Sequence, residues 1–169
     1  MSGGRVSEGR VGAGFTSRPL GALDLDRAAS LHREAFAELG ERGWTRQEIA
    51  ELLASPGVVG LLLQQDGNEI GFALCRTAAA EAELLTIAIQ ASFRRLGAGR
   101  ALLEGVIATA LERGAGSLFL DVGDDNPAAL ALYRQRGFAP VGRRAGYYAR
   151  AGRPAADAIV MRLALKRGG

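Results

Sequence analysis

The sequence predicts a mixed α/β domain, with helices on both faces of a sheet that combines parallel and antiparallel strands. Three observations predict this class. Four segments repeat apolar residues at helical spacing, six short segments have the apolar content typical of strands, and turn residues join some of those strands directly. The predicted order is α-α-β-β-β-α-β-α-β-β, which places hairpins towards both ends and strand–helix–strand crossovers in the middle.

The composition is that of a soluble globular protein: 169 residues, 48% apolar and 23% charged. Residues 1–17 are rich in Gly, Ser and Arg, so we expect a disordered leader before a single domain at residues 18–166. No apolar run approaches the ~20 residues that span a bilayer, and no secretory signal is visible, so we expect a cytoplasmic protein. The lone cysteine, Cys75, leaves no internal disulfide, and the lone histidine, His32, has no His or Cys partner, so no metal site is expected.

Two helices are predicted first along the chain. The first begins at Asp24 and stops at Gly40. Thr45 and Glu48 form a capping box that begins the second, which ends near Ala54 before a Ser-Pro-Gly turn. The buried face of the first helix is predicted to carry Leu25, Ala28, Leu31, Ala35 and Leu39.

Strands follow at residues 58–64 and 70–76, and an Asp-Gly-Asn turn between them predicts a hairpin. Residues 83–89 form a third strand. A loop with two glycines then leads into a helix at about 97–113, followed by a strand at 117–122. The buried face of that helix is predicted to carry Leu102, Leu103, Val106, Ile107 and Ala110.

The last part of the chain is predicted to hold one helix and two strands. An Asn-Pro pair at 126–127 begins the helix, with Asn as N-cap and Pro in the first turn, and Gly137 ends it. The strands are expected at about 138–144 and 158–165, with a loop at 146–156 between them.

The glycine loop is the strongest functional signal. Gly97 and Gly99 let the backbone approach a ligand closely, and the free N–H groups and dipole of the next helix favour an anion. The diphosphate of a nucleotide-like cofactor fits such a site, and Arg94, Arg95 and Arg100 reinforce it. The alternative is a turn in an ordinary strand–helix connection.

A Rossmann dinucleotide site does not fit, because Leu102 stands where the third glycine of that fingerprint belongs. The spacing Arg94-x-x-Gly97-x-Gly99 instead resembles the Gln/Arg-x-x-Gly-x-Gly/Ala signature of the GNAT superfamily of acetyl-CoA-dependent N-acetyltransferases. The order of elements resembles the GNAT fold too, over about residues 19–165.

A second group of polar residues follows further along the chain. Asp121 lies near the C-terminal end of a central strand, where ligands gather in α/β sheets. Asn126 follows five residues later, and Tyr133 lies two helical turns beyond it. Acetyl transfer to an amine needs a base for the amine, N–H groups for the thioester oxygen and an acid for the departing thiolate.

These residues extend the resemblance to the RimI-type ribosomal-protein-alanine N-acetyltransferases. The motifs occur in the expected order: 81–89, Leu120-Asp121-Val122, Asn126, Ala-Leu-Tyr-x-x-x-Gly-Phe at 131–138, Gly146-Tyr147-Tyr148 and 157–161. The resemblance implies acetyl-CoA as co-substrate, with its acyl and pantetheine part on the 87–89 strand, its diphosphate on the glycine loop and Tyr133 as proton donor. The implied cofactor residues are Ile87, Ala88, Ile89, Arg94, Arg95, Leu96, Gly97, Ala98, Gly99, Arg100 and Asn126.

One departure from the family concerns the general base, which is a glutamate in a Leu-Glu-Val strand where this chain has Asp121. Aspartate is shorter by one methylene, roughly 1.5 Å, and can act through a bridging water. A terminal α-amine has a pKa of about 7.8 against about 10.4 for lysine, which corresponds to about 3.5 kcal/mol less deprotonation work. Glu83 is the alternative base and Glu81 a more distant one, and Asp121 can also be a strand-end residue that caps the next loop.

Other residues also carry two interpretations. Tyr133 can be a packed helix aromatic. Glu83, Tyr147 and Tyr148 can line the acceptor site, and the two tyrosines can equally be edge-strand aromatics. Trp44 can pack over the acceptor, although a hydrophobic staple at the second helix fits better.

The sequence therefore predicts transfer of acetyl from acetyl-CoA to a protein N-terminal α-amine, with alanine of a small-subunit ribosomal protein as acceptor. Direct attack in a ternary complex is expected because no well-placed Cys or Ser nucleophile is found. The alternatives are acetylation of a small amine, an antibiotic or a lysine side chain, or a non-catalytic acetyl-CoA-binding module. We expect a monomer or weak dimer that binds neither membrane nor nucleic acid.

Overall fold

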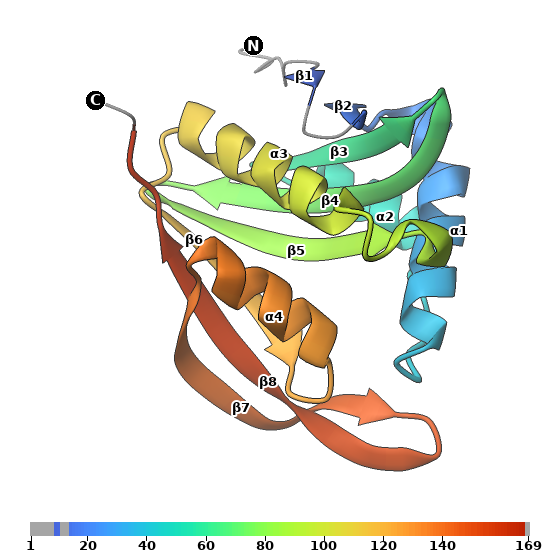
Figure 1. Ribbon diagram of the computed structural model, residues 1–169, viewed down its shortest axis with the longest axis vertical. Helices are drawn as coiled ribbons and strands as arrows, with labels where there is room; N and C mark the ends of the chain where they lie inside the picture. The colour runs from blue at the N-terminus through green and yellow to red at the C-terminus, as the bar shows by residue number, and fades with distance from the viewer. Residues whose placement is uncertain (1–8, 11–13, 168–169) are drawn as a thin grey trace.

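The computed structural model describes residues 9–10 and 14–167, and within them eight strands form one sheet (Figure 1). The strands are β1 Gly9–Arg10, β2 Thr16–Pro19, β3 Val58–Gln65, β4 Asn68–Ala78, β5 Glu81–Ile89, β6 Ser117–Gly123, β7 Ala139–Arg150 and β8 Arg153–Ala164. The helices are α1 Leu25–Ala37, α2 Arg46–Ala54, α3 Ala98–Glu112 and α4 Pro127–Arg136. No helix in these ranges is both long enough and apolar enough to cross a membrane.

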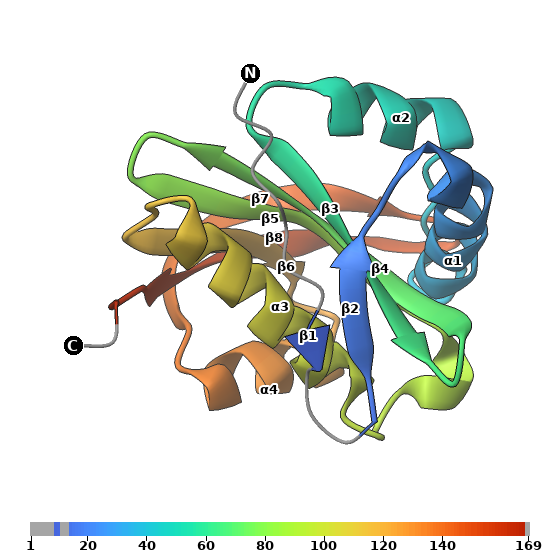
Figure 2. The same cartoon turned by 90° about the horizontal axis from the view of Figure 1, so that it is seen from above.

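The sheet is mixed, with strand order β1-β2-β3-β4-β5-β6-β8-β7. Only β5 and β6 run parallel, because α3 returns the chain to the end of the sheet where β5 began; every other neighbouring pair is antiparallel. Figure 2 shows α1 and α2 on one side of the sheet and α3 and α4 on the other. The predicted mixed α/β class, with helices on both faces, is confirmed.

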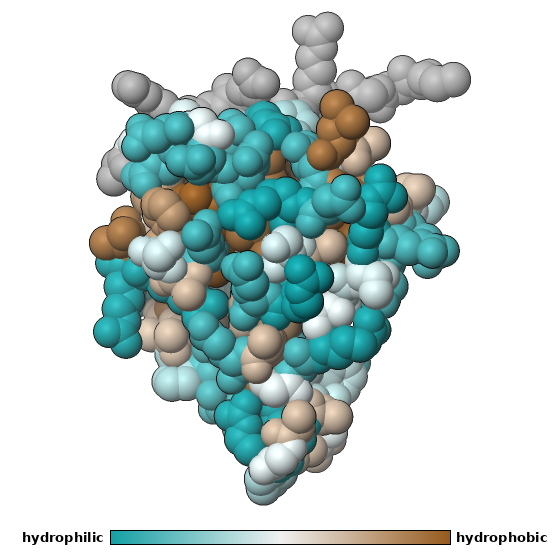
Figure 3. Space-filling model, turned by 90° about the vertical axis from the view of Figure 1, so that its right-hand side faces the viewer, coloured by the Kyte–Doolittle hydropathy of each residue, from teal (hydrophilic) through white to brown (hydrophobic). Residues whose placement is uncertain are grey.

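Each pair of helices closes its own hydrophobic core. The face of α3 predicted to be buried is confirmed, since all five of its residues are at most 4% exposed. The α1 face is buried at Leu25, Ala28 and Leu31 against Leu62 and Phe72 of the sheet. On the outside, the face that carries α1 is mostly hydrophilic, with apolar atoms in small separate groups (Figure 3). The helices are therefore amphipathic surface helices that bury one side.

Local sequence signals set the ends of several elements. The Thr45 side chain accepts a hydrogen bond from the backbone N–H of Glu48 at 3.1 Å, as the capping box predicts. Asn126 Oδ1 likewise accepts from the Ala129 N–H at 3.2 Å at the start of α4. Asp66 and Gly67 both have positive φ, +50° and +79°, as a tight two-residue hairpin turn between β3 and β4 requires.

The N-terminal prediction needs correction where the structure describes it. Phe15 is 2% exposed in the core beneath α3, and β2 pairs with β3 from Thr16 onwards, so ordered structure begins before residue 18. A four-residue strand is too short to show a periodic pattern, and it forms because β3 offers it an open edge. The rest of the predicted leader, residues 1–8 and 11–13, lies outside the described residues.

The predicted loop at 146–156 is also wrong, because β7 continues to Arg150 and β8 begins at Arg153. The pairing of the two strands shifts register between Arg144 and Tyr148, where Gly146 has a φ of +59°. Nearly all of β7 is exposed, so it lacks the alternation of buried and exposed residues that reveals a strand in sequence.

Candidate active site

Strands β5 and β6 pair over only part of their length and then diverge. Their parallel pairing consists of Glu81–Ser117, Ala82–Leu118 and Glu83–Phe119, whereas β5 continues to Ile89 and β6 to Gly123. Figure 1 shows the two strands diverging, with α4 in front of the opening. Beyond Glu83, the described part of the chain gives β5 no strand partner on this side, so its backbone can pair with an extended ligand.

A β-bulge sets which side chains of β5 face this region. Leu74 pairs with Thr86 but Cys75 pairs with Leu84, so Leu85 is the extra residue. The bulge turns Ile87 towards the core beneath α3 and α4. It turns Thr86 towards α1, where Thr86 Oγ1 lies 3.1 Å from His32 Nε2. The three residues predicted to hold the acyl part, Ile87 to Ile89, therefore all lie on the part of β5 that has left β6.

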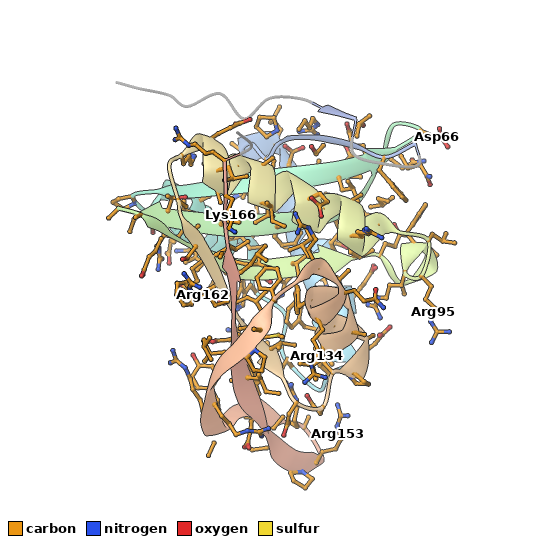
Figure 4. The ribbon with its side chains drawn as sticks, turned by 60° about the vertical axis from the view of Figure 1, so that its left-hand side comes forward. Asp66, Arg95, Arg134, Arg153, Arg162 and Lys166 are labelled. Carbon is orange, nitrogen blue, oxygen red and sulfur yellow. The ribbon has the colours of Figure 1, made fainter. Side chains whose placement is uncertain are left out.

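The glycine loop has two residues in the left-handed region, Arg95 at φ +65° and Gly97 at φ +87°. Gly97 is the N-cap of α3, no atom lies within 4 Å of the place where its Cβ would be, and the first-turn N–H groups of the helix open beside it. Arg95 and Arg100 are exposed, and Figure 4 shows Arg95 projecting away from the loop. The backbone N–H groups of this helix start are thus available to an anion, and Arg95 and Arg100 lie exposed beside them.

The other predicted loop residues have structural roles as well. Arg94 forms an ion pair with Glu38, just after α1, which ties the loop to that helix. Leu96 is 60% exposed, while Ala98 is fully buried. A Cβ on Gly99 would lie 3.4 Å from Leu132 Cδ2 of α4, so α4 packs beside the start of α3. The predicted anion site and the helix of Tyr133 are therefore neighbours.

Asp121 and Glu83 lie on the same face of adjacent strands. The neighbours of Asp121, Leu120 and Val122, point into the core beneath α3 and α4, so its half-buried carboxylate points to the opposite face. The same alternation places the exposed Glu83 on that face too. Asp121 Oδ2 lies 3.9 Å from Nε of Arg144 on β7. Both candidate bases stay available, and Asp121 is the more enclosed of the two.

Tyr133 points from α4 into the opposite core. It is 5% exposed and packs edge-on against Phe138, with ring centroids 5.6 Å apart. Burial raises the pKa of its phenol well above the ordinary value of 10. The phenol therefore holds its proton at neutral pH.

A pocket of about 450 Å³ lies between the segment that follows α1 and the end of β7. Its walls are Gly40, Glu41, Arg42, Tyr147, Tyr148, Ala149, Arg150 and Ala151. Burial, followed by the negative charge of Asp121, raises the pKa of Tyr148, which places Tyr148 within electrostatic reach of that carboxylate. Both tyrosines thus lie on an edge strand and line the pocket.

Two parts of this pocket were missed from sequence. These parts are Glu41 and Arg150, which form an ion pair across 109 residues of the chain, and no local motif marks either residue.

Trp44, by contrast, lies away from the pocket. It stacks on His32 at 4.6 Å between ring centroids, and its backbone N–H donates to His32 Nδ1 at 2.9 Å. Trp44 therefore packs inward at the start of α2 rather than into the pocket.

This fold and site define an acetyltransferase of the GNAT family. The model of that family, described as "Acetyltransferase (GNAT) family", matches residues 25–138, and the chain belongs to it. It is accordingly an acetyl-CoA-dependent N-acetyltransferase.

Within the family the chain is RimI-like. It is 38% identical over 150 residues to the N-alpha-acetyltransferase RimI of Mycobacterium tuberculosis, covering 85% of this chain and 90% of that protein. It is 41% identical over 102 residues to the ribosomal protein bS18-alanine N-acetyltransferase of Escherichia coli K12, covering 60% and 68%. The crystal structure of the ribosomal-protein-S18-alanine N-acetyltransferase from Escherichia coli superposes with a TM-score of 0.82 at 32% identity, covering 92% and 96%.

Proposed function

We propose that the chain acetylates the N-terminal α-amine of a protein, with the alanine of a small-subunit ribosomal protein as acceptor. The observation that carries this proposal is the edge of β5 beyond Glu83, which no described strand covers. The left-handed Gly97 at the start of α3, and Tyr148 of the pocket within electrostatic reach of Asp121, support it. The relatives named above support the acceptor, since those from Escherichia coli are named for an alanine of a ribosomal protein.

Acetyl-CoA is held along the free edge of β5 and at the start of α3. Ile87, Ala88 and Ile89 offer backbone groups to the acyl and pantetheine part, and Asn126 contacts the pantetheine chain while it caps α4. The diphosphate is bound by the loop from Arg94 to Arg100. The left-handed Gly97 and the open space around it support this arrangement, because a close backbone approach needs both.

Asp121 acts as general base. It takes a proton from the acceptor ammonium, directly or through one water, and the amine nitrogen then attacks the thioester carbonyl carbon. This role is supported by Tyr148, a residue of the pocket wall that lies within electrostatic reach of the Asp121 carboxylate. Glu83 is the second candidate, on the same face but more exposed.

Tyr133 acts as general acid. As the new C–N bond forms and the C–S bond breaks, the phenol gives its proton to the departing sulfur, and the nitrogen loses its second proton to solvent. Solvent later returns a proton to the phenol and takes one from Asp121. A covalent route through Cys75 is unfavourable, because this thiol is 2% exposed and burial raises its pKa to about 11. Direct attack in a ternary complex is the route that remains.

The test compares two peptides as acceptors in an assay of thiol release from acetyl-CoA. One peptide has a free N-terminal alanine and no lysine; the other has the same sequence with a blocked N-terminus and one added lysine. Transfer to the first alone is expected. Transfer to lysine alone, or tight binding of acetyl-CoA without transfer to either peptide, contradicts the proposal.

A further inference from the structure

Arg150 is a buried charge to which the mechanism above assigns no role. It is the last residue of β7 and part of the pocket wall, and only 2% of its side chain is exposed. Arginine is rarely buried unless its donors are satisfied. The carboxylates that satisfy them come from two other segments of the chain.

The first partner is Asp125, in the connection between β6 and α4. Arg150 Nε donates to Asp125 Oδ2 at 2.8 Å and Nη2 donates to Oδ1 at 3.0 Å, which is a bidentate ion pair. The pair lowers the pKa of Asp125 and raises that of Arg150, so both groups stay charged. Asp125 stands between Asp121 and Asn126, the cap of the helix that carries Tyr133.

The second partner is Glu41, in the segment between α1 and α2, which accepts from Arg150 Nη1. The same segment is bound once more, because the Ala151 N–H donates to the Gly40 carbonyl at 3.1 Å. The third contact is the Tyr148 ring, whose centroid lies 5.0 Å from the guanidinium carbon. One guanidinium thus joins both walls of the pocket to the connection that follows the Asp121 strand.

The surrounding backbone makes room for this arrangement. A Cβ on Gly123 would lie 2.5 Å from Asp125 Oδ1 and 2.8 Å from Arg150 Nη2, so any larger residue at the end of β6 would displace the ion pair. Gly123 has no positive φ, which means that space and not backbone conformation requires glycine here. The site for the guanidinium is therefore built by the fold.

We propose that Arg150 is a positioning residue that fixes the acceptor pocket relative to Asp121 and Tyr133. A buried ion pair is weak evidence for stability, because apolar residues can fill such a space at no greater cost. The segment of Glu41, the connection of Asp125 and the end of β7 are instead held at fixed distances from one another by directional hydrogen bonds. A planar guanidinium supplies such bonds and an ammonium does not. The proposal rests on the proposed function, since it takes this pocket as the acceptor site.

The test compares Arg150→Met with Arg143→Met in the full-length protein. Arg143 is the matched control: it lies on the same strand and also pairs with two carboxylates, Asp124 and Asp157, but is 55% exposed and outside the pocket. For Arg150→Met, kcat/KM for the alanine peptide is expected to fall about 10- to 100-fold, because loose positioning of reactants costs this much. The KM for acetyl-CoA is expected to stay unchanged, and Arg143→Met is expected to behave as wild type. Wild-type kcat/KM in Arg150→Met overturns the proposal.

A triple variant separates positioning from simple destabilisation. Arg150→Met leaves two unpaired carboxylates, so Glu41→Gln and Asp125→Asn are added to remove them. We expect the triple variant to regain thermal stability but not kcat/KM for the peptide. We expect Arg150→Lys to keep part of the wild-type kcat/KM. Recovery of both quantities in the triple variant means that Arg150 is merely structural.

Hydrogen exchange gives a readout that needs no acceptor. In Arg150→Met, the amides at residues 40–43 and 147–151 are expected to exchange faster, while those of α3 exchange as in wild type. Unchanged exchange in both pocket segments overturns the proposal. A wild-type protein that transfers acetyl to no peptide contradicts the proposed function, and the exchange result then still decides whether Arg150 ties the segments together.

Discussion

Lowering the pH from 7 to 5 is expected to destabilise the fold through one side chain, His32. The ring is 1% exposed and stacks between Phe36 and Trp44, with centroids 4.0 and 4.6 Å away. Nδ1 accepts from the Trp44 backbone N–H, so the proton is on Nε2, which donates to Thr86 Oγ1 at 3.1 Å. Burial lowers the pKa of His32 to about 4 from 6.5, while Glu48 and Arg42 act in opposite directions.

The magnitude follows from that shift. Between pH 6.5 and 4 the unfolded chain binds a proton on His32 that the folded chain does not, so the free energy of unfolding falls as the pH falls through this window. The full shift corresponds to about 3 kcal/mol, of which about 2 kcal/mol is lost between pH 7 and pH 5. The contribution is complete above the unfolded pKa, and below pH 4 the loss stops growing.

The assay is direct because the chain has one histidine. The imidazole resonance, followed by NMR, is expected to stay at its neutral position down to about pH 5. Urea unfolding of the wild type and of His32→Gln, at pH 7 and at pH 5, then measures the histidine contribution as a difference. The wild type is expected to lose about 2 kcal/mol more than the variant. A ring that titrates near its ordinary pKa, or equal losses in both proteins, refutes the reasoning.

Three further predictions concern the active site. Tyr133→Phe is expected to lower kcat by about 100-fold or more with acetyl-CoA affinity unchanged by calorimetry; full turnover removes its role as acid. Asp121→Asn is expected to lower kcat/KM for the peptide, and a wild-type value transfers the role to Glu83 or water. Gly97→Ala places a Cβ at φ +87°, which costs about 1–2 kcal/mol, so KM for acetyl-CoA should rise while KM for the peptide does not; equal changes in both argue against a cofactor loop.

Much of the fold was predictable because its signals are local. The capping residues Thr45 and Asn126 and the hairpin turn at Asp66 each satisfy backbone groups within three residues of themselves, so short windows of sequence reveal them. The buried face of α3 is visible for the same reason, because its spacing follows from 3.6 residues per turn alone. The glycine loop belongs to this group too, since Gly97 needs its positive φ whatever surrounds it.

Elements that depend on a distant partner were missed or misjudged. The strand β2 forms because β3 leaves an edge to pair with, and β7 extends to Arg150 because β8 pairs with it through irregular register. Neither strand has an alternating burial pattern of its own. The assignment of 146–156 as a loop failed for that reason.

For the site, the sequence was sufficient to nominate candidate residues, because their types and spacing match a family motif within one strand or one helix. The sequence could not show whether Asp121 and Glu83 share a face of the sheet, since that depends on how β5 pairs with β6 before the two strands diverge. The ion pair between the two walls of the pocket could not be predicted from the sequence either. Glu41 and Arg150 meet across 109 residues, and a contact between side chains so far apart has no local signature in the chain.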